Sequence, residues 1–553
     1  MIVRGPDVTY DELRAGFSWA LPERLNIGTA CSDAQASTSL ALVDLVDGDV
    51  REYTFGQLSE LSNRFANALA GLGVTPRDRV GVLLPQGLET AVAHLAAYKL
   101  GGVVVPLTKL FGADAVRYRL GDSEARVLVT DQETLERLAD AVADLTGLKV
   151  VVVGDRAPAP HHRWTDLIHR GSARFDPAAT GPDDPALLIY TSGTTGAPKG
   201  ALHGHRVLLG HLPGFELMFD FFPQGGDRMW TPADWAWIGG LLDAVLPSWY
   251  HGRPVIAARR ARFDPEWAVQ LMVDHHVRNA FLPPTSLKLM READVRHADL
   301  ALRSVMSGGE PLGAEMLAWG EAHLGVTVNE IYGQTEANLL VGNSASVWPV
   351  RAGSMGRPYP GHEVAVLDTD GHPASAGAEG QIACRAPDPV MLLEYWRRPD
   401  ATAAKFRGQW LLTGDVGTVD EDGYFWFSAR DDDVINSAGY RIGPAEIEEC
   451  IVGHPAVAMA AAVGVPDPVR GSVVKAFVRL GEGHAPSPAL EAEIRDRVRG
   501  RLAAYSYPRE IEFVDDLPLT TTGKIRRLDL RLREEQRRAD GGPPDHPDTE
   551  EHL

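Results

Sequence analysis

The sequence has few of the residues that hold disulfide-rich or metal-stabilised proteins together. Only three of its 553 residues are cysteines, and Cys31, Cys384 and Cys450 are far apart along the chain. Their odd number and spacing argue against a disulfide framework and against a zinc site. The histidine pairs at 161–162 and 275–276 come with no third ligand nearby, so we expect no structural metal.

Long apolar runs and a secretion signal are also missing. No stretch approaches the ~20 apolar residues needed to cross a bilayer, and the start, "MIVRGPDVTYDELRAG", lacks a basic region followed by an apolar one. We therefore expect a cytoplasmic protein without membrane insertion.

Basic residues are in the minority. The chain has 54 Lys and Arg against 75 Asp and Glu, a net charge of −21. Such a field repels nucleic acid, so we expect no nucleic-acid partner. Any anionic ligand must be held by local groups.

What is present is an alternation of apolar strands and helical segments, the pattern of an α/β protein. The runs at 79–85, 103–107, 125–130 and 149–153 predict strands, and 134–145 predicts a helix. Thr54 is a predicted N-cap for a helix that ends near Gly71. A chain of 553 residues exceeds one hydrophobic core, so more than one domain is expected.

The pattern changes near residue 420. The segment 416–427, "VGTVDEDGYFWF", predicts a hairpin whose turn uses Asp422 and Gly423 at positive φ. The segments after it predict a small α+β unit. We expect an N-terminal domain at 1–431, a C-terminal domain at 432–535 and, from its Pro, Gly and acidic composition, a disordered tail at 536–553.

One loop indicates phosphate binding. The segment "YTSGTTGAPKGALHGH", 190–205, follows the apolar run "ALLIY" with glycines, hydroxyls and a lysine. Converging backbone N–H groups and a cation suit a triphosphate. The Walker spacing fails, however, and a Gly/Ser/Thr cluster taken alone is more often an ordinary loop than a phosphate site.

Further motifs decide between these interpretations. "YTSGTTGAPKG" resembles the signature loop of the adenylate-forming superfamily of acyl-CoA synthetases, luciferases and peptide-synthetase adenylation domains. In the expected order come "SGGEPL" (307–312), "NEIYGQTE" (329–336), "GRPYPG" (356–361), "WLLTGD" (410–415), "ARDDDVINSAGYRIGPAEIE" (429–448) and "LPLTTTGKIRR" (517–527). The chain is thus identified as a member, with acetyl- and medium-chain acyl-CoA synthetases the most similar group.

The resemblance implies a large N-terminal AMP-binding (adenylation) domain of α/β subdomains and a small mobile α+β C-terminal domain. It also implies a reaction in two steps. A carboxylate attacks the α-phosphate of ATP, giving acyl-AMP and pyrophosphate, and the thiol of CoA then takes the acyl group. Mg²⁺ is the implied cofactor, and ATP and CoA are co-substrates.

The resemblance also implies residue roles. The loop side chains would cover the β- and γ-phosphates, and the "SGGEPL" and "NEIYGQTE" motifs would border adenine, contact the α-phosphate and bind Mg²⁺ through Glu336. The ATP- and AMP-binding set is Thr191, Ser192, Gly193, Thr194, Thr195, Lys199, Gly309, Glu310, Pro311, Tyr332, Asp415, Arg430 and Arg441, and the catalytic set is Lys524, Thr335 and Glu336.

The C-terminal motifs imply a change of domain orientation. Lys524 would bridge the carboxylate and the α-phosphate during adenylation, with Asp432 as the hinge. Gly439 and Tyr440 would lie on the CoA path after rotation. Two residues depart from the usual pattern: Ala429 replaces a common glycine, and Tyr440 stands where histidine is frequent.

The acyl substrate is less clearly indicated. Acetate-specific members place tryptophan after the adenine-stacking aromatic residue, whereas Gly333 stands here, which implies an open acyl pocket. Trp235 and Trp237, in "MWTPADWAWIGG", would line it or belong to the core. We expect a medium-chain or branched fatty acid, with an aryl acid second.

Two other classes of function remain open. The chain could load the thiol of a carrier protein, or bind nucleotide without chemistry, although Lys524, Glu336 and Asp415 argue against the second. Lys524, in a basic turn, is also a candidate for reversible acetylation, with a lysine acetyltransferase and deacetylase as partners.

Overall fold

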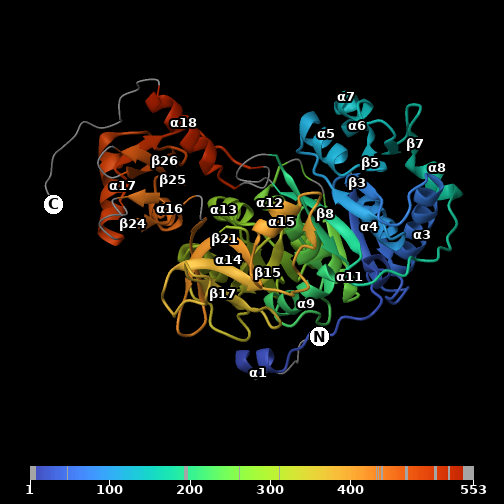
Figure 1. The fold of residues 1–553 in the computed structure, drawn as a ribbon, viewed down its shortest axis with the longest axis horizontal. Coiled ribbons are helices and arrows are strands. Elements are labelled where there is room, and N and C mark those ends of the chain that lie inside the picture. Colours follow the sequence, from blue (N-terminus) through green and yellow to red (C-terminus); the bar gives the residue numbers. More distant parts are fainter. Residues whose placement is uncertain are drawn as a thin grey trace. The chain divides into compact units, whose positions relative to one another are not determined.

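The computed structural model describes residues 8–46, 48–191, 197–258, 260, 262–310, 312–430, 433, 435–437, 440–467, 471–502, 507–520 and 524–539. The chain divides into two compact units (Figure 1). Unit 1 comprises 1–364 and 384–411, and unit 2 comprises 365–383 and 412–553. The predicted α/β class is confirmed, with a large N-terminal and a smaller C-terminal part. The boundary at 432 stays a prediction.

The first sheet of unit 1 has eight strands in the order β19-β9-β8-β4-β3-β5-β6-β7. Neighbouring strands are parallel from β8 through β4, β3, β5 and β6 to β7. Strand β9 pairs antiparallel with both β8 and β19. Near-continuous valine runs form strands buried on both faces, as parallel sheets require. The strands are β3 (Arg79–Leu83), β4 (Val103–Pro106), β5 (Val127–Asp131), β6 (Lys149–Val153), β7 (His162–Arg163), β8 (Pro185–Thr191), β9 (Lys199–Gly204) and β19 (Glu394–Tyr395).

Helices surround this sheet. Helix α3 packs against α4 and α8 (Figure 1), and Thr54 caps α3 in a capping box with Gln57, so the predicted N-cap is confirmed. The helices are α3 (Phe55–Gly71), α4 (Leu88–Lys99), α5 (Ala113–Asp122), α6 (Gln132–Arg137), α7 (Ala139–Ala143) and α8 (Trp164–Arg170).

The second sheet of unit 1 has the order β16-β15-β14-β13-β12-β10-β11-β1-β2. Its middle strands are parallel, and β14, β15 and β16 are antiparallel neighbours. The strands are β1 (Leu40–Val46), β2 (Asp49–Thr54), β10 (Met229–Trp230), β11 (Val255–Ala258), β12 (Asn279–Phe281), β13 (Ser304–Gly308), β14 (Val328–Gln334), β15 (Ala337–Gly342) and β16 (Ser354–Pro358).

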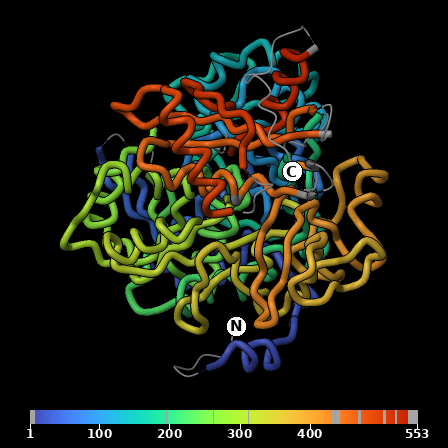
Figure 2. Tube along the Cα trace, turned by 90° about the vertical axis from the view of Figure 1, so that its left-hand side faces the viewer, coloured from blue at the N-terminus to red at the C-terminus, as the bar shows by residue number. Residues whose placement is uncertain are grey.

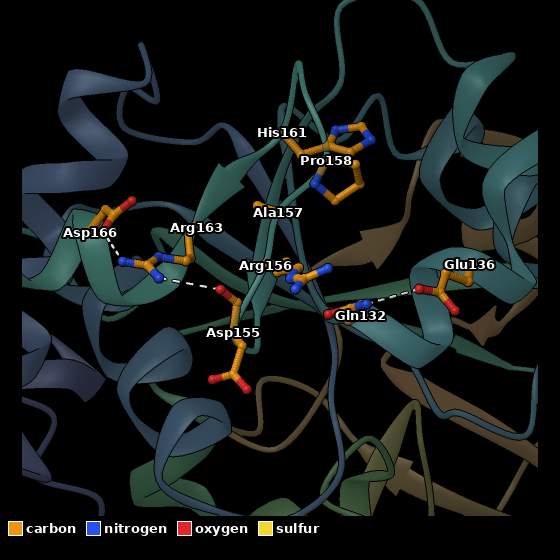
Figure 3. A pocket seen from close by; sticks show the side chains of 9 residues that line it. All are labelled: Gln132, Glu136, Asp155, Arg156, Ala157, Pro158, His161, Arg163 and Asp166. Carbon is orange, nitrogen blue, oxygen red and sulfur yellow. Dashed lines mark hydrogen bonds and ion pairs between the residues drawn. The ribbon is translucent and has the colours of Figure 1, made fainter.

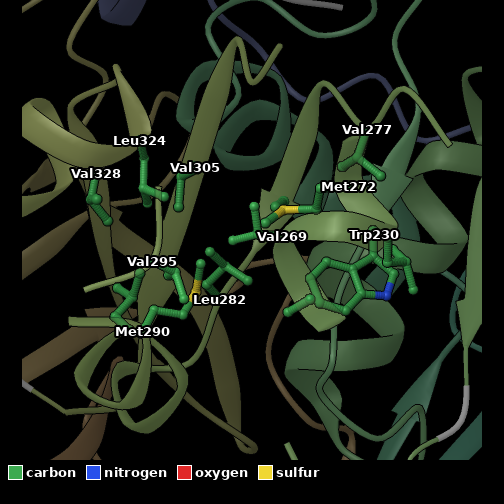
Figure 4. Close-up of a cluster of buried hydrophobic side chains, with 14 of the residues drawn as sticks. Trp230, Val269, Met272, Val277, Leu282, Met290, Val295, Val305, Leu324 and Val328 are labelled. Carbon is green, nitrogen blue, oxygen red and sulfur yellow. The ribbon is translucent and has the colours of Figure 1, made fainter. Parts of the chain in front are cut away.

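A hydrophobic cluster fixes the middle of this sheet. Trp230, Val305 and Val328 from three strands pack with Met272 and Met290 from the helices α12 (Pro265–Asp274) and α13 (Pro284–Glu292) (Figure 4). Helix α14 (Ala314–Leu324) covers the same cluster. The carboxyl ends of β13 and β14, which carry two of the motifs, are thereby held in place.

The remaining helices of unit 1 lie around the two sheets. Helix α1 lies beside the segment near residue 350 (Figure 2), where the Tyr10 hydroxyl donates to the Pro358 carbonyl at 2.9 Å. These helices are α1 (Tyr10–Ala15), α2 (Ile27–Ala30), α9 (Val207–Met218), α10 (Ile238–Gly240), the π-helix η1 (Leu241–Val245), α11 (Leu246–Tyr250) and α15 (Pro399–Ala404), and the short strand β20 (Phe406–Arg407) pairs with β21.

The strands β17 (Val364–Leu367), β18 (Gly380–Arg385), β21 (Trp410–Val419) and β22 (Phe425–Arg430) are successive neighbours in the strand order, and their residues lie largely in unit 2. Further along the chain, β25 (Val457–Asp467), β26 (Gly471–Leu480) and β27 (Glu510–Phe513) form a three-stranded sheet. The other elements are β23 (Ile435–Ser437), β24 (Tyr440–Ile442), α16 (Pro444–Val452), α17 (Pro488–Arg501) and α18 (Arg527–Ala539).

Three local predictions need correction. The helix predicted at 134–145 is instead two short helices, α6 and α7, separated at Leu138, whose backbone leaves the helical conformation (φ −111°, ψ 13°), and α7 ends at Ala143. In the hairpin between β21 and β22 only Gly423 has positive φ, because the loop is wider than a two-residue turn, with Gly423 N–H donating to the Asp420 carbonyl. Disorder predicted from 536 is wrong for 536–539, where α18 continues.

The end of α18 is held by ion pairs. Arg537 pairs with Glu534 at 2.9 Å, and Arg538 pairs with Glu510 at 2.6 Å. These contacts explain why composition alone misjudged the segment. Within the described ranges, none of the helices is both long and apolar enough to cross a membrane.

Candidate active site

The predicted phosphate loop joins two antiparallel strands of the first sheet. Thr191 ends β8, Lys199 begins β9, and the two residues are register partners. The Thr191 hydroxyl donates to the Lys199 carbonyl at 3.3 Å. Ser192, Gly193, Thr194 and Thr195 lie outside the described residues. The sheet therefore fixes both ends of the loop.

The Lys199 ammonium points at an aromatic ring from a distant part of the chain. Its Nζ lies 5.4 Å from the centroid of the Tyr395 ring, on β19. The Tyr395 hydroxyl in turn donates a short hydrogen bond to Oε1 of Glu336, and the Leu392 N–H donates to the Glu336 carbonyl at 2.8 Å. The lysine of the loop and the predicted Mg²⁺ carboxylate thus contact the same tyrosine.

Sequence reasoning missed Tyr395. No local pattern marks it, because its role depends on the pairing of β19 with β9, in which Tyr395 lies opposite Ala201. That pairing joins residues almost two hundred positions apart.

The β14–β15 hairpin presents the second motif. Tyr332 lies opposite Val341 on β15, and Gln334 lies opposite Ala337, so Thr335 and Glu336 form the turn. The side chains of Tyr332, Thr335 and Glu336 are half-buried. A short antiparallel hairpin is stiff, which suits residues that must hold a nucleotide in one place.

The first adenine motif reaches the same sheet edge. β13 and β14 are parallel with Gly308 opposite Ile331, so Gly309 and Tyr332 come directly after paired residues. Gly309 adopts φ of 101°, which favours glycine. Glu310 lies 3.7 Å from the Lys288 ammonium. Pro311 is outside the described residues.

A buried histidine lies behind the Thr335–Glu336 turn. His203, on β9, is fully buried, and burial lowers its pKa to about 4, while the Thr335 backbone and the Glu336 carboxylate oppose the shift. His203 is therefore neutral near pH 7. The turn packs on an uncharged ring, which leaves the Glu336 carboxylate available for a cation on its other side.

The three predicted acyl-pocket residues have different surroundings. Trp235 is buried and packs edge-on against Trp249, with 6.0 Å between ring centroids. Trp237 is half-buried and packs edge-on against Phe111. The two tryptophans therefore do not form one cluster.

Gly333 has a packing reason to be glycine. A Cβ built there would lie 2.4 Å from the Leu339 backbone N and 2.7 Å from Oδ1 of Asn338. Beneath it, the Asn338 amide donates to both carboxylate oxygens of Asp243 at 2.8 and 2.9 Å, and burial raises the Asp243 pKa to about 8. The Cα of Gly333 therefore lies against the facing strand of the hairpin, at Asn338 and Leu339, and not beside open space.

In unit 2, the predicted ribose aspartate and its arginine are neighbours. Asp415 on β21 lies opposite Arg430 on β22, and Arg430 Nε is 3.1 Å from Oδ1 of Asp415. Asp415 is buried, 4% exposed, so this carboxylate is held in one orientation.

The other C-terminal predictions are only partly described. Tyr440 and Arg441 belong to β24, opposite Ser437 and Asn436, and their side chains are not described. Asp432 and Gly439 lie outside the described residues. Their roles stay predictions.

Lys524 is exposed and lies on a short turn of unit 2. The Thr520 N–H donates to the Lys524 carbonyl at 2.7 Å, and the Lys524 N–H donates to the Thr520 hydroxyl at 3.0 Å. These two hydrogen bonds join the backbone of Lys524 to Thr520.

A pocket of about 520 Å³ opens elsewhere in unit 1, among residues of α6, β7, α8 and the loop between β6 and β7 (Figure 3). It is an open, polar hollow in which Arg163 already pairs with Asp166 at 2.6 Å and donates to the Asp155 carbonyl. None of the motif residues lines it.

Comparison with known proteins agrees with the motifs. The family model of AMP-binding enzymes matches residues 32–396, and that of the AMP-binding enzyme C-terminal domain matches 446–524. The chain is 37% identical to an uncharacterised acyl-CoA ligase, YtcI, of Bacillus subtilis, covering 89% of this chain and 92% of the relative. It is also 37% identical to acetyl-coenzyme A synthetase of the same organism, over 87% and 85%.

Solved structures show the same architecture. The anthranilate CoA ligase AuaEII in complex with anthranoyl-AMP superimposes with a TM-score of 0.86 at 30% identity, covering 94% of this chain and 99% of that one. The family matches, the motif order and the fold agree, and the chain therefore belongs to the AMP-binding enzyme family, the adenylate-forming acyl-CoA synthetases, which are acid–thiol ligases.

Proposed function

We propose that this enzyme activates a carboxylic acid with ATP to acyl-AMP, releasing pyrophosphate, and transfers the acyl group to the thiol of CoA. The observation that carries the proposal is the convergence of Lys199 and Glu336 on the Tyr395 ring. A cation and a carboxylate that contact the same tyrosine suit a triphosphate with its metal ion.

Mg²⁺ fits the residues at this turn. Glu336 offers hard carboxylate oxygen, and within the described chain no cluster of three His, Cys, Asp or Glu side chains could enclose a metal by itself. Mg²⁺ usually binds one or two carboxylates together with substrate phosphates, so a single glutamate is sufficient. When bound, the ion would neutralise phosphate charge.

The chain's own residues then align the reactants. Thr191, Thr335 and Lys199 contact the phosphates, Tyr332 stacks on adenine, and Asp415 accepts from the ribose hydroxyls. Lys524 offsets the charge that develops as the substrate carboxylate attacks the α-phosphate. No nucleophilic side chain is required, because the carboxylate and the CoA thiol are the nucleophiles.

For the acid, we propose a medium-chain or branched fatty acid in a cytoplasmic enzyme. The support for a longer chain is the resemblance, in which acetate-specific members place tryptophan where Gly333 stands here. The close contact of Gly333 with the Leu339 backbone is a separate reason for glycine at this position. An aryl acid is the second candidate, favoured by the structural match to an anthranilate CoA ligase. Neither the structure nor the comparisons support a lysine acetyltransferase or deacetylase as a partner, so that prediction is not carried further.

A pyrophosphate-release screen tests the proposal. Purified enzyme is given ATP, Mg²⁺ and CoA with straight, branched and aromatic acids, and the acyl-CoA product is identified by mass. We expect the highest kcat/KM for acids longer than acetate, with about 0.8 kcal/mol gained per buried methylene. A preference for acetate contradicts the fatty-acid assignment. Formation of a thioester on a carrier protein but not on CoA would make the carrier protein the acceptor.

A further inference from the structure

Among the described residues, a bridge between Leu519 and Ile525 and two hydrogen bonds between Thr520 and Lys524 close the turn that carries Lys524. Ile525 packs against a cluster that includes Leu517 and Leu530. The position of an exposed lysine on so short a turn therefore depends on how the next element, α18, is held.

A bidentate ion pair holds the start of α18. Arg527, the first residue of α18, donates from Nε and Nη2 to the two carboxylate oxygens of Glu448 at 2.9 and 2.5 Å. Glu448, on α16, also accepts from the Ala462 N–H of β25 at 2.8 Å. The two side chains are only 22% and 12% exposed, so the pair is stronger than a surface contact.

The same arginine reaches the segment after the predicted hinge. Arg527 Nη1 lies 3.5 Å from Oδ2 of Asp433, and Arg531, one turn further along α18, lies 3.1 Å from Oδ1. Asp433 comes directly after Asp432 in the sequence and is 13% exposed. Its N–H donates to the Arg430 carbonyl at 2.9 Å. Two arginines of α18 therefore hold the residue next to the hinge.

We infer that Arg527 is a positioning residue for adenylation: through Asp433 and Glu448 it fastens the Lys524 turn to the chain after the hinge. The inference rests on the proposed function and deepens it. Rotation about the hinge then moves Lys524 as part of one body, and its ammonium arrives in one place. Without Arg527 the turn keeps its own bridge and the packing of Ile525, and Arg531 still pairs with Asp433, but the first residue of α18 loses its ion pairs with Glu448 and Asp433.

Measuring the two half-reactions separately distinguishes this positioning role in adenylation from a general loss of activity. Arg527→Ala, Arg527→Lys and the control Arg526→Ala are compared in acid-dependent exchange of pyrophosphate into ATP and in thioester formation from supplied acyl-adenylate. Arg526 is the neighbouring arginine, 54% exposed, and pairs with Asp529 of α18.

Because a misplacement of about 1 Å costs roughly 100-fold in rate, we expect Arg527→Ala to lower the kcat of adenylation about 10- to 100-fold. The KM for ATP and the thioester step should stay within about twofold, since Lys524 does not serve them. Arg527→Lys recovers part of the loss, and Arg526→Ala changes neither step. Unchanged adenylation in Arg527→Ala, or equal loss in both half-reactions, overturns the inference.

A milder variant, Asp433→Asn, tests the same link if Arg527→Ala fails to fold. Asp433→Asn keeps the side-chain volume and the Arg527–Glu448 pair, and removes the charge at the hinge side. It should lower adenylation selectively by a smaller factor, and no selective loss contradicts the link. Faster hydrogen exchange at the Thr520 and Lys524 amides in either variant is a readout independent of turnover. If wild-type enzyme shows no acid-dependent exchange, the proposed function fails, and amide exchange still tests the link.

Discussion

Two lysines serve the proposed chemistry, and they are supported in opposite ways. Lys199 begins a six-residue strand inside an eight-stranded sheet and faces the Tyr395 ring. Lys524 lies on a turn with a single bridge, and ion pairs of the next helix hold that turn. On the proposed mechanism, the first is a fixed charge and the second is a movable one. The proposal thus assigns ATP binding to sheet structure and assigns the charge needed for one step to a separate element.

The largest effect is expected from the movable lysine. Lys524→Ala removes a charge aimed at the developing transition state, and loss of one such group costs roughly 10²–10³ in kcat. Acid-dependent pyrophosphate exchange measures adenylation, and supplied acyl-adenylate with CoA measures the second step. Adenylation should fall and thioester formation should persist. Equal loss of both would remove the distinction between fixed and movable charge.

On the fixed side, Glu336→Gln should have the next largest effect. It replaces the proposed Mg²⁺ carboxylate by a neutral amide of the same shape, and contacts of a charged group are worth about 1.5–3 kcal/mol, or roughly 10- to 100-fold. The rate should recover partly at higher Mg²⁺ concentration. A variant with wild-type rate at all Mg²⁺ concentrations contradicts the assignment.

Tyr395→Phe tests how Tyr395 supports the fixed charges of Lys199 and Glu336. It keeps the ring that faces Lys199 and removes the hydroxyl that donates to Glu336. We expect a loss of about tenfold or less, mainly in the KM for ATP, because a single hydrogen bond to a charged group is removed. Tyr395→Leu removes the ring as well and should cost more. If the two variants behave alike, the ring contributes nothing to Lys199.

Gly333→Ala tests the stiffness of the β14–β15 hairpin. The added methyl would meet the Leu339 backbone N at 2.4 Å, and overpacking of this kind costs about 1–3 kcal/mol of stability. Gly71→Ala is the matched control, because a methyl added there would have no atom within 4 Å. Urea unfolding should separate the two variants. Equal free energies of unfolding for Gly333→Ala and Gly71→Ala would mean that the hairpin backbone shifts to accommodate the methyl group, which contradicts a stiff hairpin.

The smallest effect at neutral pH concerns His203. Its folded pKa, about 4, lies below its ordinary value of 6.5, so the unfolded chain binds a proton that the native state does not. Above pH 6.5 the ring is neutral in both states, and the free energy of unfolding keeps its full value. Between pH 6.5 and 4 that free energy falls with pH, by up to about 1.4 kcal/mol per pH unit. His203→Gln should flatten that part of the unfolding profile. An unchanged acid slope contradicts it.

Local patterns in the sequence predicted local structure well. Thr54 is the expected N-cap, and the motif order identified the family, because both depend on neighbours in the chain. Long-range contacts were missed. Tyr395 meets Glu336 through the β19–β9 pairing, Gly333 is constrained by the facing strand, and α18 extends to 539 because its arginines reach Glu510 and Glu534. Such contacts depend on topology, which no local periodicity encodes.

The most direct measurement is exchange of labelled pyrophosphate into ATP in the absence of CoA. Because adenylation is proposed to be complete before the thiol enters, wild-type enzyme with Mg²⁺ and its preferred acid should incorporate label, and Lys524→Ala should not. Exchange that requires CoA, or turnover that yields ADP and phosphate in place of AMP and pyrophosphate, would contradict the two-step reaction.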